Sequence, residues 1–316
     1  MKLYRNLEEF LPLSNAVVTT GTFDGVHIGH QTVLNQLKSV AEKNNGESVV
    51  LTFFPHPRMV LYPDETNIKL INTIEERIEL LEKECIDHLI VHPFSYEFSR
   101  ISSLEFVRNI LVNQIGTKKL VIGYDHRFGR NREGAFEHLK DFGPLYGFDV
   151  EEIPALEVQQ INVSSTKIRH SLEIGEIIAA NEFLGRPFFI TGKVEQGNQV
   201  GRKIDYPTAN IFIEEDYKLI PAQGVYAIKA KVKNKIFDGM LNIGVRPTVN
   251  GSNNTIEVHL FDFSEDIYGE QIRVYFYHRI RDEKKFNSLE ELKHQLDEDR
   301  ETAQRLLATE QDSLYL

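Results

Sequence analysis

The chain has 316 residues, of which 41% are hydrophobic and 26% charged, and its formal net charge is −11. This composition is typical of a globular protein and excludes a disordered or fibrous chain, while the length favours two domains. The negative charge argues against binding to nucleic acid or to anionic membranes. There is no basic and apolar signal segment at Met1 and no apolar run long enough to span a bilayer, so we expect a cytoplasmic protein.

The first half of the chain alternates predicted strands and helices. Short apolar runs predict strands at 16–20, 48–54, 88–92, 119–123 and 148–153. Amphipathic runs predict helices through 33–41, 73–86, 103–115 and 136–146. The only cysteine, Cys85, lies near the end of the second helix, where we expect it to pack rather than to act as a nucleophile. The alternation indicates a parallel α/β sheet with its ligand site at the carboxyl ends of the strands.

The pattern changes after Gly185. Short runs joined by turns predict strands at 188–194, 225–232, 236–243, 255–261 and 272–278, which together indicate a small antiparallel barrel. Ser288, with Glu291 three residues later, is typical of the start of a long closing helix. We place the domain boundary near 184–187 and expect domains at 1–184 and 185–316.

A candidate phosphate site follows the first strand, in the segment Gly21–His30 (GTFDGVHIGH). His27 and His30 are three residues apart at a helix start and would share a face, with Gly29 leaving room for a phosphate beside them. The helix dipole and the imidazoles would both favour an anion. A surface histidine pair or a zinc site is the alternative, but Asp24 is the only nearby carboxylate and no cysteine is close.

This segment resembles the HxGH motif of the nucleotidylyltransferase superfamily, and in its full form it is similar to bacterial FMN adenylyltransferases. Three further segments, TFFPHPR at 52–58, GYDHRFGR at 123–130 and VSSTKIR at 163–169, are similar to the other motifs of that family in the same order. The resemblance implies that His27 and His30 are catalytic. It also implies that nucleotide or flavin is bound by Gly21, Phe23, Asp24, Gly29, His56, Arg58, Asp125, Ser164, Ser165, Thr166 and Arg169.

The chemistry of these residues suits adenylyl transfer. Hydroxyls at 164–166 and the guanidinium of Arg169 offer donors and a fixed positive charge to a triphosphate, although such a serine pair alone is more often a helix cap. Arg58, in a loop stiffened by proline, could meet the phosphate of FMN, while His56 could equally be a surface residue. That phosphate is already anionic, so catalysis needs positioning and charge neutralisation rather than a general base.

The second half carries its own set of motifs. LGRPF at 184–188, GRK at 201–203 and PTAN at 207–210 resemble bacterial riboflavin kinases, although a glycine-rich loop alone is more often a set of turns. Five later segments also resemble riboflavin kinases: GVYA at 224–227, NIGVRPTVNG at 242–251, EVHLFDF at 257–263, DIYGEQI at 266–272 and RDEKKF at 281–286. The resemblance implies that Glu257 is the base for the ribityl hydroxyl and that Thr208 and Asn210 bind Mg²⁺. Gly201, Arg202, Pro207 and Arg300 are then substrate-binding residues.

Residue pattern alone leaves some of these roles open. Thr208 and Asn210 alternate along a strand-like segment and would project to one side, which suits two ligands of one Mg²⁺. Glu257 on pattern alone is an outward-facing strand residue, and Arg300 is about as well explained by a surface charge pair. Asp205 occupies a position where the kinase motif has glycine, and its carboxylate would repel phosphates if it faced the site.

The leading hypothesis is a bifunctional enzyme of flavin synthesis. It joins an α/β Rossmann-like nucleotidylyltransferase domain with a parallel sheet to a small antiparallel β-barrel riboflavin kinase domain with a C-terminal helix. The expected ligands are Mg²⁺, ATP, riboflavin, FMN and FAD, without nucleic acid or membrane, in a monomer or weak homo-oligomer. One alternative is adenylyl transfer alone, with a weakened kinase domain that binds flavin; another is a non-enzymatic flavin sensor.

Overall fold

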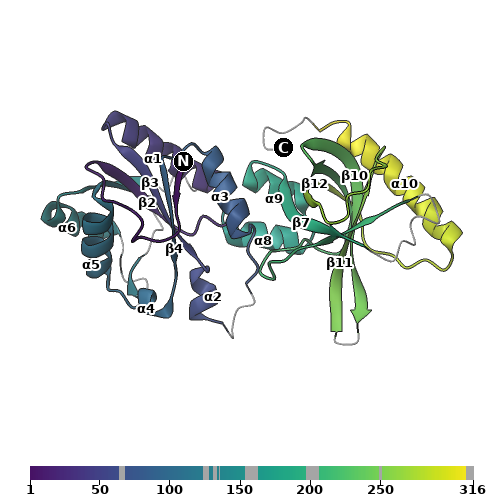
Figure 1. Ribbon diagram of the computed structural model, residues 1–316, viewed down its shortest axis with the longest axis horizontal. Helices are drawn as coiled ribbons and strands as arrows, with labels where there is room; N and C mark the ends of the chain where they lie inside the picture. The colour runs from purple at the N-terminus through teal and green to yellow at the C-terminus, as the bar shows by residue number, and fades with distance from the viewer. Residues whose placement is uncertain are drawn as a thin grey trace. The chain divides into compact units, whose positions relative to one another are not determined.

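The computed structural model describes residues 1–63, 68–123, 128–130, 134, 136–153, 163–196, 206–248 and 251–310. The chain divides into two compact units, Met1–Ser164 (unit 1) and Ser165–Leu316 (unit 2) (Figure 1). Across the described residues, no helix has the length and apolar character needed to cross a membrane.

Unit 1 is built on a parallel sheet of six described strands in the order β1-β4-β3-β2-β5-β6. The strands are β1 (Lys2–Tyr4), β2 (Ala16–Thr20), β3 (Glu47–Phe54), β4 (His88–Pro93), β5 (Thr117–Gly123) and β6 (Asp149–Ile153). From β2 the chain proceeds to β3 and β4 on one side, then returns to β5 on the other. The switch point of this order therefore lies between β2 and β5, where ligands bind in such sheets. The predicted parallel sheet is confirmed.

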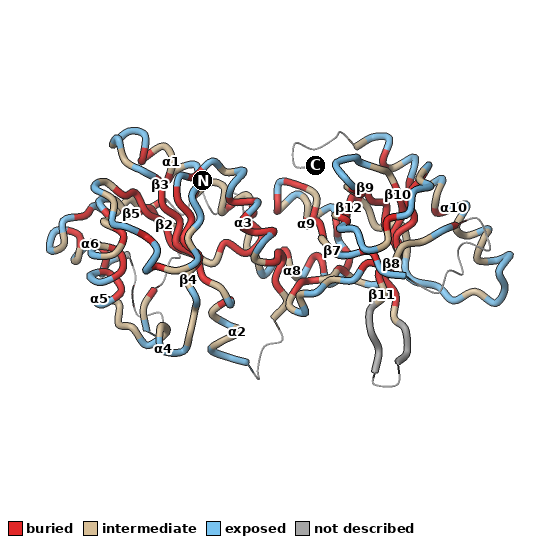
Figure 2. Tube along the Cα trace, in the orientation of Figure 1, coloured by how far each residue is buried: buried red, intermediate tan, exposed pale blue. Residues whose placement is uncertain are grey.

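The helices of unit 1 are α1 (Ile28–Lys43), α2 (Pro57–Leu61), α3 (Ile74–Lys83), α4 (Tyr96–Ser99), α5 (Ser103–Glu105), the π-helix η1 (Phe106–Ile115) and α6 (Phe136–Tyr146). Among these, α1, η1 and α6 pack on the sheet. Strands β2, β3 and β5 are largely buried (Figure 2). Apolar side chains of these strands form one cluster with those of η1. The helix predicted at 103–115 is therefore present, but from Phe106 it has π rather than α geometry.

The prediction that Cys85 packs in the core is wrong. Cys85 is exposed and has a left-handed φ of 56°. Helix α3 ends at Lys83 and Glu84 is its C-cap, so Cys85 lies beyond the helix and does not follow its apolar stripe.

Unit 2 begins with helices α8 (Ser165–Glu173) and α9 (Ile177–Leu184). The Asn181 side chain of α9 donates to the Phe276 carbonyl at 2.8 Å and accepts from the Phe188 amide at 2.7 Å, so α9 packs on strands of this unit. Packing thus groups both helices with the second half of the chain. The functional boundary near residue 184 stays a prediction.

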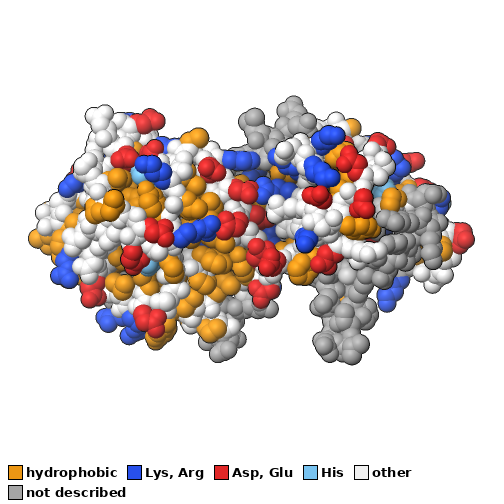
Figure 3. All heavy atoms as spheres, viewed as in Figure 1, with side chains coloured by type: hydrophobic (Ala, Val, Ile, Leu, Met, Phe, Trp, Pro, Cys, Tyr) orange, Lys and Arg blue, Asp and Glu red, His pale blue; other side chains and the backbone are white. Residues whose placement is uncertain are grey.

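The rest of unit 2 is a closed barrel with the order β10-β11-β8-β7-β12-β9 and antiparallel pairing throughout. Its strands are β7 (Phe188–Glu195), β8 (Ala209–Phe212), β9 (Gly224–Val232), β10 (Lys235–Thr248), β11 (Gly251–Leu260) and β12 (Gln271–Arg281). The predicted antiparallel barrel is confirmed. On the face of the molecule seen in Figure 3, acidic and basic side chains are intermixed on both units.

Helix α10 (Leu289–Leu307) contacts the barrel. It starts as predicted, with the Ser288 hydroxyl accepting from the Glu291 amide at 3.1 Å. Asp299, only 2% exposed, accepts from Arg281 of β12 in a two-pronged ion pair with distances of 2.7 to 3.1 Å. This pair joins the closing helix to the barrel wall.

We expect Asp299→Ala to lower the free energy of unfolding of unit 2 by about 3 kcal/mol, because it leaves the Arg281 guanidinium without its buried partner. Urea denaturation followed by circular dichroism measures the change. Glu298→Ala, which removes an exposed carboxylate from the same helix, is the matched control and should have an effect under about 0.5 kcal/mol. Equal effects of the two variants would show that the ion pair does not hold α10.

Candidate active sites

The loop after β2 is held in an unusual backbone conformation. Phe23, Gly25 and Val26 all have left-handed φ angles, of 48°, 93° and 40°. Glycine tolerates such an angle, but phenylalanine and the β-branched valine do so only when the surroundings impose it. Both side chains are buried, and Asp24, 1% exposed, accepts from the amide of Ile71 at 3.0 Å. Asp24 therefore anchors this loop to the segment before α3.

The two motif histidines lie together as predicted. His27 is the N-cap of α1, and its Nδ1 accepts from the His30 amide at 3.3 Å. The imidazole rings are stacked, with centroids 3.6 Å apart and planes inclined by 13°. A Cβ on Gly29 would lie 3.2 Å from the His27 ring and from Val163 Cγ1, so only glycine leaves this space open. The same contact brings the chain at 163–164 to the start of α1.

His30 is neutral at neutral pH. Burial, the neighbouring His27 and the positive charge of Arg77 hold its pKa well below the ordinary value of 6.5. The Nδ1 atom of His30 is buried and makes no hydrogen bond with any described residue. In this neutral state the imidazole can still donate a hydrogen bond from a ring nitrogen, but it carries no positive charge.

The loop after β3 supplies the next predicted residues. Its Phe54–Pro55 peptide bond is cis. His56 is buried and caps α2, with Nδ1 accepting from the Arg58 amide at 3.2 Å, so it is not a surface residue. Arg58 itself is exposed. Gly21, at the end of β2, donates to the Leu51 carbonyl of β3 at 3.1 Å, which places the two loops on neighbouring strands.

The remaining residues predicted to bind nucleotide are divided between the two units. Ser164 ends unit 1, whereas Ser165, Thr166 and Arg169 belong to α8 of unit 2. Ser165 and Arg169 are half-buried and Thr166 is exposed. Asp125 lies outside the described residues, as do Gly201, Arg202 and Asp205 of the kinase motif.

In the barrel, the predicted base and a predicted metal ligand are brought side by side. Glu257 of β11 is paired with Asn210 of β8 and, on its other side, with Asn242 of β10. Directly opposed residues of antiparallel strands have Cβ atoms about 5 Å apart on the same face. Glu257, Asn210 and Thr208 are all half-buried, so they remain accessible to a ligand.

Two contacts fix the segment that carries the predicted metal ligands. His259, two residues after Glu257, donates from Nδ1 to the Pro207 carbonyl at 2.8 Å. Tyr206 donates to Asp297 of α10, and burial together with this carboxylate raises the pKa of the tyrosine to about 12. Arg300 of α10 lies over the Phe261 ring at 5.4 Å and 3.6 Å from the Asp262 carboxylate. The PTAN segment is thus held between β11 and α10.

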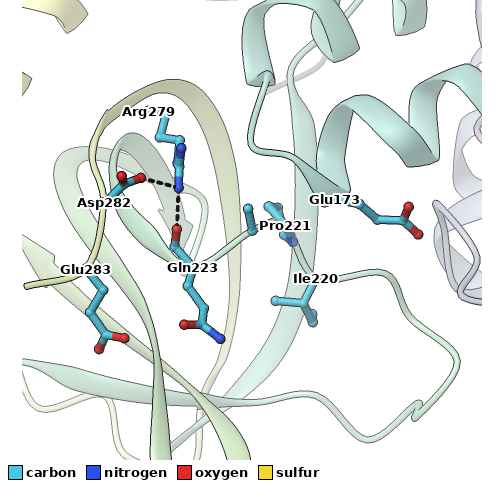
Figure 4. Close-up of a pocket in the computed structure, with 8 residues that line it drawn as sticks. Glu173, Ile220, Pro221, Gln223, Arg279, Asp282 and Glu283 are labelled. Atoms are coloured by element: carbon cyan, nitrogen blue, oxygen red, sulfur yellow. Dashed lines mark hydrogen bonds and ion pairs between the residues drawn. The ribbon is translucent and has the colours of Figure 1, made fainter.

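A cavity of about 600 Å³ opens beside the start of β9, lined by Glu173, Ile220, Pro221, Ala222, Gln223, Arg279, Asp282 and Glu283. Figure 4 shows Arg279 reaching toward Asp282 and the Gln223 carbonyl, at 2.8 and 2.6 Å. The Glu283 carboxylate fills the place where Gly244 of β10 would carry a side chain. The RDEKKF and NIGVRPT segments, far apart in sequence, therefore lie against each other.

One residue at the first site was missed by the sequence analysis. Arg77 of α3 is 2% exposed, and its guanidinium donates to the carbonyls of Thr22 and Phe53. A signal was present, because Arg77 falls at helical spacing between Ile74 and Leu81 on the apolar stripe. A charge on a buried stripe requires a partner, which only the tertiary structure identifies.

The lowered pKa of His30 has a consequence for stability. In the unfolded chain this histidine binds a proton near pH 6.5, whereas in the folded chain it stays neutral there. Its contribution to the free energy of unfolding is therefore complete above that pH and decreases as the pH falls below it. We expect the thermal midpoint of unit 1 to drop between pH 7 and about pH 5.5. In His30→Gln that part of the drop should disappear, and an unchanged pH dependence would contradict the assignment.

Comparison with known proteins finds a matching family for each half of the chain. Residues 11–167 match the family described as FAD synthetase, and residues 184–307 match the family described as riboflavin kinase. A relative from Haemophilus influenzae is 40% identical over 92% of this chain and 94% of its own length, and one from Bacillus subtilis is 36% identical over 92% of both. Each is named a bifunctional riboflavin kinase/FMN adenylyltransferase.

A solved structure covers nearly the whole chain. It is 32% identical, has a TM-score of 0.88 over 96% of this chain and 98% of its own, and is described as a macrolide-efflux protein from Streptococcus pneumoniae. That description differs from the names of the sequence relatives, but the likeness extends through both units. On the matched domains and the full-length relatives, the chain belongs to the family of bifunctional riboflavin kinase/FMN adenylyltransferases.

Proposed function

We propose that this chain phosphorylates riboflavin with ATP to give FMN, and then transfers AMP from a second ATP to FMN, giving FAD and pyrophosphate. The observation that carries the proposal is the pairing of Glu257 with Asn210 in the barrel of a chain that also has the stacked His27–His30 pair. Each arrangement suits one of the two reactions. Family membership supports both in the same chain.

The kinase step is assigned to unit 2. The carboxylate of Glu257 accepts the proton of the ribityl 5′-hydroxyl as its oxygen attacks the γ-phosphorus of ATP, and ADP leaves. Asn210 and Thr208 offer neutral oxygens to Mg²⁺, and the described residues contain no cluster of three or more His, Cys, Asp or Glu that could hold a metal. Such a donor set fits a Mg²⁺ that is shared with ATP phosphates. When bound, the ion neutralises charge on those phosphates.

The adenylyl step is assigned to unit 1. A phosphate oxygen of FMN attacks the α-phosphorus of ATP, and the bond to the departing pyrophosphate breaks. The amides at the start of α1, the imidazole of His27 and the neutral imidazole of His30 offer hydrogen bonds to the charge that develops. Ser164, next to Val163 at Gly29, is a further donor, and Arg58 is assigned to the phosphate of FMN.

The finer expectations belong to the same proposal. Asp125, Gly201 and Arg202 complete the two nucleotide sites by resemblance of their motifs. The net charge of −11 supports a protein that binds small molecules rather than nucleic acid. We propose that it acts in the cytoplasm as a monomer or weak homo-oligomer.

The proposal is tested with two matched variants, each assayed for both steps by chromatography of the flavins. Glu257→Gln keeps the shape of the side chain but removes the base, so riboflavin phosphorylation should fall by about 10²- to 10⁴-fold while supplied FMN is still converted to FAD. His27→Asn keeps a good helix cap but removes the imidazole, so the FAD step should fall by about 10²-fold while FMN formation continues.

The wild-type chain is the reference and should yield FMN and then FAD from riboflavin, ATP and Mg²⁺. Formation of FAD from FMN without any phosphorylation of riboflavin would favour adenylyl transfer alone. A variant that reduces both steps equally would contradict the division between the units.

A further inference from the structure

Arg77 is a buried cation that none of the assigned roles explains. It is 2% exposed and among the largest fully buried side chains of the protein, on a helix face that also buries Ile78 and Leu81. A guanidinium remains charged in a protein, and removing it from water is costly unless acceptors replace the water. The contacts it makes therefore indicate what its burial achieves.

The guanidinium joins two loops that follow neighbouring strands. Its Nη1 donates to the Thr22 carbonyl, in the loop after β2 that leads to His27 and His30. Its Nη2 donates to the Phe53 carbonyl at 3.1 Å, near the end of β3 and just before the loop of His56 and Arg58. One planar fork thus bonds to both segments from which the ligand groups project.

The segment before α3 holds the first loop at a second point. The amides of Ile71 and Asn72 donate to Asp24 at 3.0 and 3.4 Å. Thr73 and Glu76 form a capping box at the start of α3, with hydrogen bonds of 3.1 and 3.2 Å, so this segment has a defined geometry. The start of α3 is therefore a rigid frame for the loop whose left-handed φ angles require outside support.

We propose that Arg77 is a positioning residue for adenylyl transfer: by bridging the Thr22 and Phe53 carbonyls, it sets the spacing between the nucleotide-binding loop and the loop that receives the phosphate of FMN. The inference rests on the proposed function of unit 1. Reaction between two bound phosphates depends on their relative placement, and misplacement by about 1 Å can cost about 10²-fold in rate. Arg77 acts through the two loops and, being buried beneath them, touches neither substrate.

The decisive variant is Arg77→Met, which keeps the length of the side chain but removes the charge and both donors. With supplied FMN, we expect kcat to fall by up to about 10²-fold, because the two phosphates are misplaced. The KM values for ATP and for FMN should both rise about tenfold or more, because both loops lose their common support. Riboflavin phosphorylation in the same chain should change by less than about twofold, since its residues lie in unit 2.

A second readout does not depend on turnover. Of the residues that the structure describes, those that face His30 are the stacked His27, Phe23 with its ring at 5.1 Å and the charged Arg77. Loss of that charge should raise the pKa of His30, measured by NMR titration of its ring protons. A role in general stability alone would lower the amount of folded protein and thus the apparent kcat, but it would leave both KM values and this pKa unchanged.

Two further variants complete the test. Arg5→Met removes an exposed arginine that pairs with Glu75 of the same helix at 3.1 Å, and it should leave both KM values unchanged. Arg77→Lys keeps the charge but lacks the planar fork, so both KM values should rise by about threefold, and it decides the question if Arg77→Met does not fold.

Unchanged KM values in the folded Arg77 variants would overturn the inference, and so would a rise for one substrate alone, because the bridge serves both loops. A wild-type chain that forms no FAD from FMN and ATP would instead overturn the proposed function. The two failures are therefore distinguishable.

Discussion

Parallel pairing of β2 with both β3 and β5 is the constraint on which unit 1 depends. Because parallel strands end at the same edge of a sheet, the loops after β2 and β3 must emerge side by side. Pairing alone does not fix how two such loops are spaced, since loops are the mobile parts of an α/β fold. The hydrogen bonds of Arg77 and Asp24 supply that second constraint.

In unit 2 the corresponding constraint is antiparallel register. The pairing of β8, β11 and β10 places Asn210, Glu257 and Asn242 in one row across the barrel wall. A slip of one residue in any of these strands would turn its member of the row to the other face. Closure of the barrel and the attachment of α10 through Arg281 and Asp299 oppose such a slip. The strand register that stabilises the barrel therefore also fixes the geometry of its site.

Local patterns in the sequence predicted what depends on local physics. The capping residue Ser288 and the main strands follow from short-range preferences and were found correctly. Strand β1 and helices α2 and α4 are too short to show a period, and the π geometry of η1 has no signature that separates it from an α-helix. Cys85 was misplaced because a helical period was extended beyond the end of its helix.

The candidate sites likewise have features that local sequence predicts and features that depend on tertiary structure. Motifs predicted His27, Glu257 and Asn210 as site residues, but not the neutral state of His30, which depends on burial, on the neighbouring His27 and on a cation 47 residues further along the chain. Asp24 was grouped with the ligand-binding residues, whereas one of its oxygens accepts from amides of the distant segment 71–72. These contacts join residues that are distant in sequence, and the sequence around each residue gives no sign of them. They can be seen only in the tertiary structure.

The two sites differ in a way that follows from their nucleophiles. A ribityl hydroxyl must lose its proton as it attacks, so the proposed kinase site needs a carboxylate, and Glu257 is flanked by the neutral amides of Asn210 and Asn242. The phosphate of FMN is already anionic, and a base would only repel it. Unit 1 accordingly presents imidazoles and helix amides, with the buried charge of Arg77 behind them. A chain of net charge −11 can thus bind anionic ligands through local donors, without a basic surface.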